Sequence, residues 1–195
     1  MLYQGLDIAT SQTASHVGGN VKVGDPFTYC PLVWDYLIAR FGISSVMDLG
    51  CGTGNAAWYF SSKGTKVVAV DGFEENVRRS LYPATLHDLT RGPVITQVDL
   101  VHCQEVVEHI EEAYLDHLLN SLLSGKIIAM THALPGQDGY HHVNLKPQEY
   151  WVTHLQQRGA VILEEDTRRI RELAARDGAP YMQATGLVFA NQRRL

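Results

Sequence analysis

Two short segments of the sequence concentrate side chains that can move a proton or bind a metal ion. One is Glu105-Val-Val-Glu108-His109, and the other is a glycine-rich stretch that ends on His141-His142. A carboxylate or an imidazole can take the proton of a hydroxyl group, and two carboxylates with two imidazoles can hold a divalent ion. All five residues are therefore candidate catalytic residues. The candidate ligands for magnesium, manganese, iron or zinc are Glu105, Glu108, His109 and His141.

Three interpretations of these segments stay open from the sequence. The first is a metal site, and the second is a histidine base that works without a metal. The third is structural or substrate-shaping, because two acids at the start of a helix favour its dipole and two histidines can simply lie on a surface loop. The length and glycine content of the second segment are typical of loops that carry function.

A glycine-rich turn lies some fifty residues before the first of these segments. It reads Asp48-Leu-Gly50-Cys-Gly52-Thr-Gly54, with a short apolar run before it and the start of a helix after it. Glycine has no Cβ and can take positive φ, so this backbone can turn sharply and lie against a ligand. A strand, such a turn and a helix N-terminus form a pocket for the polar end of a nucleotide-like cofactor. The spacing is not the G-x-G-x-x-G of dinucleotide-binding proteins, which disfavours a nicotinamide oxidoreductase.

This turn resembles the first motif, D-x-G-x-G-x-G, of class I S-adenosylmethionine (SAM)-dependent methyltransferases, and the resemblance covers residues 43–131. It implies SAM as cofactor. Asp71 is placed to accept the ribose hydroxyls, Asp88 resembles the acid that meets the adenine amino group, and Gln104 would lie near the methionine end. Asp48 is expected to hold the loop or approach the ammonium. The expected cofactor-binding residues are Asp48, Gly50, Gly52, Gly54, Asp71, Gly72, Phe73, Asp88, Leu89 and Gln104.

Structural roles remain open for several of these residues. Asp71 could instead cap a helix, Asp88 could stabilise a turn, and Phe73 could simply pack rather than lie on the adenine. His102 and Trp34 are expected in the core.

The acid-histidine segments also resemble known methyltransferases. The E-x-x-E-H pattern with a downstream histidine loop is similar to that of small-RNA 3′-terminal 2′-O-methyltransferases and of ubiquinone-pathway O-methyltransferases. The expected function is therefore methylation of a hydroxyl on a small molecule or sugar-like group. The alternatives are a metal-dependent RNA 2′-O-methyltransferase and a catalytically silent SAM-binding module.

Apolar periodicity predicts the elements that position these residues. Strands alternate with helices, which predicts a doubly wound, mostly parallel seven-stranded sheet of the Rossmann-like methyltransferase kind, with an antiparallel C-terminal hairpin. The strands are expected at 45–49, 66–70, 85–88, 98–102, 126–131, 161–164 and 186–190, and the helices at 31–41, 55–62, 74–81, 114–123, 147–158 and 167–175.

Length and composition give expectations for the domain organisation, the partners and the location of the protein. The 195 residues predict one domain, with residues 1–30 as an irregular N-terminal arm that frays over its first ten residues and residues 31–195 as the α/β core. Residues 16–29 could form a lid over the cofactor or an inert loop. The net charge of -5 argues against a broad basic face for nucleic acid, so a small-molecule acceptor is expected, with RNA as the alternative. Three cysteines without disulfide or metal spacing and no membrane-spanning run predict a cytoplasmic protein.

Overall fold

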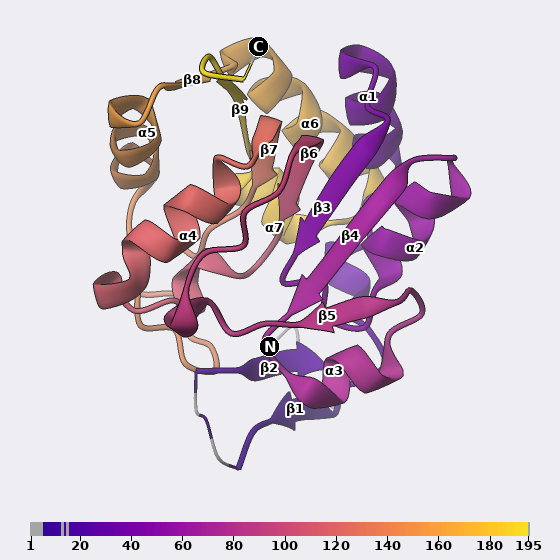
Figure 1. Cartoon of the computed structure of the whole chain (residues 1–195), viewed down its shortest axis with the longest axis vertical. Coiled ribbons are helices and arrows are strands. Elements are labelled where there is room, and N and C mark those ends of the chain that lie inside the picture. The colour runs from indigo at the N-terminus through magenta and orange to yellow at the C-terminus, as the bar shows by residue number, and fades with distance from the viewer. Residues whose placement is uncertain (1–5, 13, 15, 195) are drawn as a thin grey trace.

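A seven-stranded sheet forms the centre of the protein in the computed structural model. The structure describes residues 6–12, 14 and 16–194, and Figure 1 shows the twist of the sheet. The strand order is β5-β4-β3-β6-β7-β9-β8. Strands β3 to β7 are parallel, and β9 runs antiparallel to both β7 and β8. This confirms the predicted fold class, hairpin included. The strands are β3 (Ser45–Leu49), β4 (Lys66–Asp71), β5 (Ala84–Leu86), β6 (Val98–Cys103), β7 (Gly125–Met130), β8 (Ala160–Ile162) and β9 (Leu187–Asn191).

Helices cover both faces of the sheet because the central strands are apolar on both sides. Neighbouring residues of one strand point to opposite faces, so Val46 and Met47 pack into different core clusters. One cluster contains Trp34 and Phe60, and the other contains Trp151. The helices are α1 (Pro31–Phe41), α2 (Asn55–Ser62), α3 (Glu74–Arg79), α4 (Leu115–Leu122), α5 (Gln148–Gln157), α6 (Glu164–Asp177) and α7 (Pro180–Thr185).

The strand order reverses between β3 and β6, and in parallel sheets ligands bind outside the carboxyl ends of the strands at such a point. At the opposite, amino ends, one side chain ties these two strands together. Asp99 of β6 accepts hydrogen bonds from the backbone N–H of Ser44 and Ser45, at 3.0 and 3.1 Å, and from the Lys126 ammonium at 2.9 Å. These hydrogen bonds at the amino ends fix the register of β3 and β6, which places the carboxyl ends of the two strands side by side.

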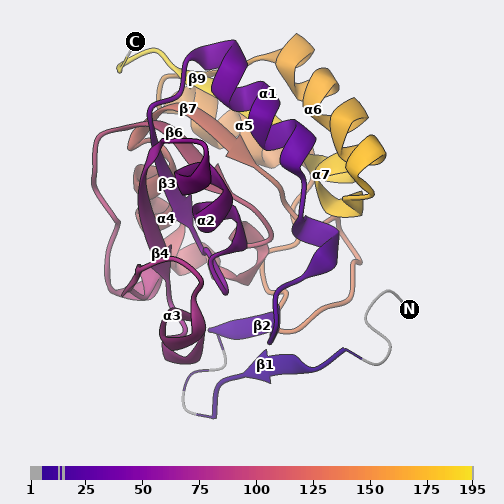
Figure 2. The same ribbon diagram turned by 90° about the vertical axis from the view of Figure 1, so that its right-hand side faces the viewer.

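The N-terminal arm is more regular than expected. Strands β1 (Ile8–Thr10) and β2 (Gly18–Val21) pair as an antiparallel hairpin, followed by a single 3₁₀ turn at Pro26–Thr28. Figure 2 shows this hairpin set across the end of the main sheet, away from α1 and α6. The expected fraying is wrong for Ile8–Thr10, and residues 1–5 lie outside the described residues. The strands are very short, and two adjacent glycines hide any alternation of apolar and polar residues, so the sequence carries no usable strand signal.

Several element boundaries also differ from the prediction. The expected strand at 85–88 is β5, which ends at Leu86, and helix α6 begins at Glu164, a residue assigned to the preceding strand. Glu164 and its acidic neighbours favour the positive end of a helix, which explains the shift. The short helix α7 was not predicted. The E-x-x-E-H segment starts only one 3₁₀ turn, Val107–His109.

Within the described ranges, no helix has both the length and the apolar character needed to cross a membrane.

Candidate active site

A cavity of about 320 Å³ lies at the carboxyl ends of β3, β4 and β6. The glycine turn, the ends of these strands, the acid-histidine segments and the N-terminal hairpin all contribute to its walls. Its volume falls in the range of small-molecule and cofactor sites. Residues 16–21 of the N-terminal arm form part of the cavity wall, where a lid could lie.

The glycine turn needs its glycines for two different reasons. Gly50, Gly52 and Gly54 all have left-handed φ, at 74°, 53° and 76°. A Cβ on Gly50 would collide with the side chain of Val106, and one on Gly54 would collide with Ser80, so packing excludes side chains there. A Cβ on Gly52 would meet no atom of the described residues within 4 Å. Gly52 therefore borders open space, as a residue that a ligand approaches would.

Asp71, at the end of β4, holds the turn from the adjacent strand. Its carboxylate accepts hydrogen bonds from the backbone N–H of Gly52 (2.8 Å) and Phe73 (2.9 Å) and from the side chain of Asn76 (3.0 Å). Burial raises the pKa of Asp71, and these three donors oppose that rise. A carboxylate has about four acceptor positions, so roughly one remains for a ligand hydroxyl. Asp71 itself precedes helix α3, whose N-cap is Phe73.

The other expected adenosine residues border the same cavity. Gly72, Phe73 and Leu89 lie in its wall. Asp88 is there too, and its Oδ2 atom is 2.8 Å from Nε2 of His16, in the N-terminal arm. Burial would raise the pKa of Asp88, but the hydrogen bonds from His16 and Thr90 outweigh burial and lower it. The carboxylate expected at the adenine thus also ties the arm to the core, and its contact with the ring stays a prediction.

Two polar side chains that the sequence predicts near the methionine end of the cofactor have buried atoms without partners among the described residues. Asp48 is 2% exposed, and its Oδ2 atom has no hydrogen-bond partner among the described residues. The Nε2 atom of Gln104 is also buried and has no hydrogen-bond partner among the described residues. Both residues border the cavity. Because buried polar atoms are normally paired, a ligand with its own donors and acceptors fits here.

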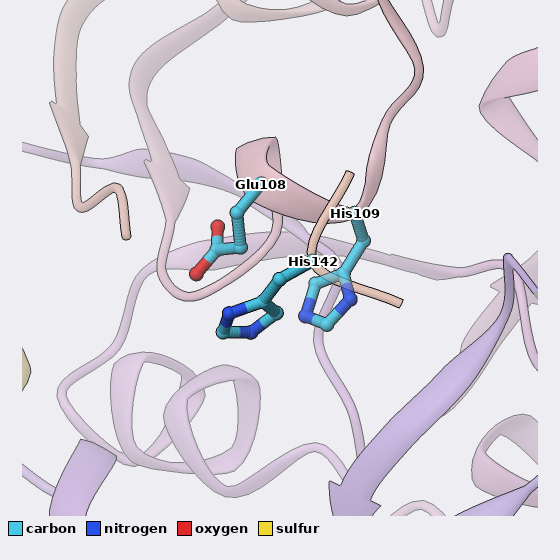
Figure 3. A group of neighbouring side chains, drawn as sticks. All are labelled: Glu108, His109 and His142. Atoms are coloured by element: carbon cyan, nitrogen blue, oxygen red, sulfur yellow. The ribbon is translucent and has the colours of Figure 1, made fainter. Parts of the chain in front are cut away.

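A candidate metal site lies beside the cavity. Glu108, His109 and His142 each offer one ligand atom, and these atoms lie within 4.8 Å of one another. In Figure 3 the Glu108 carboxylate and the His109 imidazole lie on either side of the His142 imidazole. Glu108 is fully buried, and among the described residues neither of its carboxylate oxygens has a hydrogen-bond partner. The same holds for Nδ1 of His109. Burial raises the pKa of Glu108 and lowers that of His109 to about 4, so His109 is neutral and able to ligate at neutral pH.

Two expected metal ligands lie outside this group of three. Glu105 has a left-handed φ of 56°, and its carboxylate accepts a hydrogen bond from the Thr131 hydroxyl at 2.8 Å. Burial raises the pKa of Glu105 to about 7. His141 also has a left-handed φ, 49°, and its Nε2 atom lies 4.0 Å from Glu111. The loop therefore directs His142, not His141, to Glu108.

The sequence did not single out several residues of the site. His16, Asn76 and Thr131 bond the expected site residues, but a histidine or an asparagine in a loop carries no local signal of such a contact. His102 and Trp34 are buried as expected, yet both also border the cavity. Only the pairing of β3 with β6 brings His102 next to Asp48.

Comparison with known proteins agrees with this geometry. A family model described as "Methyltransferase domain" matches residues 31–172, which is most of the chain. The chain belongs to this family. The resemblance to class I SAM-dependent methyltransferases and the expected enzyme class are thereby confirmed, and this class implies SAM as the cofactor.

Individual relatives match part of the sequence or the fold of this chain. The ubiquinone biosynthesis O-methyltransferase of Rickettsia typhi is 32% identical over 75 residues, which cover 34% of this chain. The match spans only 30% of that enzyme's length. A TehB-like SAM-dependent methyltransferase from Corynebacterium glutamicum is 16% identical with a TM-score of 0.60, over 83% of this chain and 86% of that one. The methyltransferase domain of bacterial CtHen1 is 17% identical with a TM-score of 0.55, over 79% and 92%. At these low identities, the two solved structures show a shared fold and nothing further about this chain.

Proposed function

We propose that this protein is an O-methyltransferase that transfers the methyl group of SAM to a hydroxyl of a small molecule or a sugar-like group. The observation that carries the choice of oxygen is the group of Glu108, His109 and His142 at the edge of the cofactor cavity. A hydroxyl must lose its proton to become a good nucleophile, and a cluster of carboxylate and imidazole groups suits that task. The O-methyltransferase from Rickettsia typhi supports the choice at the level of sequence.

Each part of the cavity has a task in this proposal. SAM, when bound, supplies an activated methyl group. The glycine turn and Asp71 receive the nucleoside, while Asp48 and Gln104 offer their unpaired atoms to the amino-acid end. The hairpin covers the opening and excludes water. These residues bind and orient SAM and the acceptor. Holding the methyl donor and the acceptor oxygen in line lowers the activation barrier.

The proton of the acceptor hydroxyl has a suitable destination in Glu105. Burial raises its pKa above the ordinary value of a carboxyl group, which is the direction that favours a general base at neutral pH. Thr131 fixes the direction of this carboxylate through the hydrogen bond to its side chain. Glu105 borders the cavity, so a hydroxyl bound there can reach it.

A divalent cation fits the donor set. Glu108, His109 and His142 would hold it, since two imidazoles and a buried carboxylate, whose oxygens have no partner in the described part of the chain, match magnesium, manganese, iron or zinc. When bound, the ion would polarise the acceptor oxygen as a Lewis acid. Without an ion, the same histidines remain candidates for holding the acceptor or for accepting its proton.

Calorimetry with S-adenosylhomocysteine and transfer of labelled methyl from SAM test the proposal together. Acceptors should include catechols, hydroxylated aromatic acids, sugars and short RNAs, each with chelator and then with added Mn²⁺ or Mg²⁺. Binding of the nucleoside and methylation of a small hydroxyl compound are expected. Methylation of RNA alone would replace the acceptor class, binding without any turnover would favour a silent module, and no binding at millimolar nucleoside would overturn the proposal.

A further inference from the structure

Three buried side chains form a hydrogen-bonded chain behind the glycine turn. Asp48 of β3 and His102 of β6 are register partners on the same face of the sheet, and Nδ1 of His102 lies 2.7 Å from Oδ1 of Asp48. On its other side, Nε2 of His102 is 3.2 Å from Nε1 of Trp34 in α1. All three residues are at most 3% exposed. Trp34 and Phe60 each pack a ring against the imidazole, at 5.9 and 5.6 Å between centroids, so the ring cannot turn freely.

The partners of His102 determine where its proton resides. An indole N–H can only donate, so Nε2 of His102 must be the acceptor and cannot carry a hydrogen. The single hydrogen of the neutral ring is then on Nδ1, where it is donated to Asp48. A neutral donor does not cancel the negative charge of the carboxylate. His102 therefore occupies Oδ1 of Asp48 and leaves its charge in place.

The second carboxylate oxygen of Asp48, Oδ2, is available to a ligand. Oδ2 is buried, has no partner among the described residues, and belongs to a residue that borders the cavity. A buried carboxylate oxygen without a partner is costly unless a ligand supplies a donor, and a cationic donor gives the strongest hydrogen bond.

We infer that Trp34 and His102 are positioning residues, which hold Asp48 so that its free oxygen binds the α-ammonium group of an amino-acid-bearing ligand. The inference rests on the proposed use of SAM, whose methionine end carries that group. It assigns to Trp34 and His102 a part in selecting ligands with a free amino group. Neither side chain needs to touch the reacting atoms for this role.

The test compares two nucleosides that differ at the amino-acid end. S-adenosylhomocysteine carries the α-ammonium, whereas 5′-methylthioadenosine lacks the whole amino-acid end. Calorimetry should show that His102→Gln weakens S-adenosylhomocysteine roughly 10- to 100-fold, the loss of a hydrogen bond in a charged network. Binding of 5′-methylthioadenosine should stay within about threefold of wild type, because the nucleoside pocket is unchanged. Its binding also shows that the variant is folded.

A conservative substitution separates positioning from packing. The amide of Asn at position 102 places an N–H near the former Nδ1, whereas the amide of Gln places it near Nε2. His102→Asn should therefore recover most of the affinity for S-adenosylhomocysteine that His102→Gln loses. Trp34→Phe keeps an aromatic ring and removes the indole N–H, so it should also weaken S-adenosylhomocysteine more than 5′-methylthioadenosine. This variant supplies the comparison if both substitutions at position 102 prevent folding.

Three outcomes decide the matter. Selective loss of S-adenosylhomocysteine binding supports the inference. Equal weakening of both nucleosides, or no weakening of either, overturns it while the use of SAM stands. If the wild-type protein binds neither nucleoside, the proposed cofactor itself is wrong, and the inference fails with it.

Discussion

The imidazole of His16 lies 2.8 Å from the carboxylate of Asp88, although 72 positions separate the two residues in sequence. One belongs to the N-terminal arm and the other to the rim of the cofactor cavity. A second bond joins the same two parts of the molecule, since the side chain of Asn76 donates to the side chain of Asn20 at 3.0 Å. The arm is thus bound to the wall of the cavity that it covers, which favours the lid over the inert loop among the two interpretations of residues 16–29.

His16→Ala should loosen this lid. Both side chains are about a quarter exposed, so the lost bond is worth about 0.5–1.5 kcal/mol. The affinity for S-adenosylhomocysteine should fall by about two- to tenfold, mostly through faster dissociation, as measured by stopped-flow fluorescence. Lys22→Ala is the matched control, because it breaks the Lys22–Asp7 ion pair on the same hairpin at residues that do not border the cavity. Equal effects of the two substitutions would contradict a specific role of the His16–Asp88 hydrogen bond in retaining the ligand.

The sequence predicted the sheet and the cofactor turn because both depend on local signals. Buried strands are apolar runs, and a turn with left-handed backbone needs glycine, as Gly50 and Gly54 illustrate. The candidate site was predicted only as two segments. Which histidine meets Glu108 depends on the path of a loop, and the left-handed φ of His141 is not visible in its residue type.

Contacts between distant residues were beyond sequence reasoning for a related reason. The pairing of His16 with Asp88 and of His102 with Asp48 depends on the hairpin and on sheet register, respectively. Neither histidine has a neighbour in sequence that would suggest such a partner. Each was accordingly assigned to a loop or to the core, which is correct for its location and incomplete for its role.

The adjacent histidines of the loop make a direct test of the metal site. His142→Ala removes one of the three grouped ligands and should weaken Mn²⁺ binding at least tenfold, measured by electron paramagnetic resonance or calorimetry. His141→Ala should leave Mn²⁺ affinity within about twofold, since His141 lies outside the group and is near Glu111. The opposite order would restore the ligand set expected from the sequence, and no Mn²⁺ binding by the wild-type protein would leave the histidine-base interpretation.

Asp71→Asn tests the link between the glycine turn and the nucleoside. The substitution keeps the shape of the side chain but removes the charge that the N–H groups of Gly52 and Phe73 and the side chain of Asn76 surround. Affinity for S-adenosylhomocysteine should fall by about 2–3 kcal/mol, the value of a hydrogen bond to a charged group. 5′-Methylthioadenosine should be weakened to the same extent, because it shares the ribose. An unchanged affinity for both would leave Asp71 with only a structural role in the turn.

Asp99→Asn should destabilise the fold without touching the cavity, because Asp99 ties β3 to β6 at their amino ends. Hydrogen bonds from Ser44 and the Lys126 ammonium hold the pKa of Asp99 well below its ordinary value of 3.8. A carboxyl group with a depressed native pKa adds stability that is fully present above the unfolded pKa and is lost as the pH falls through the native one. Urea unfolding at pH 7 should therefore show a loss of about 1–3 kcal/mol, and this difference should shrink steadily below pH 3.8. Asp116→Asn, at a side chain that is 77% exposed and paired with Arg158, should change stability little at any pH. A loss for Asp99→Asn that did not depend on pH would mean that shape rather than charge holds the two strands in register.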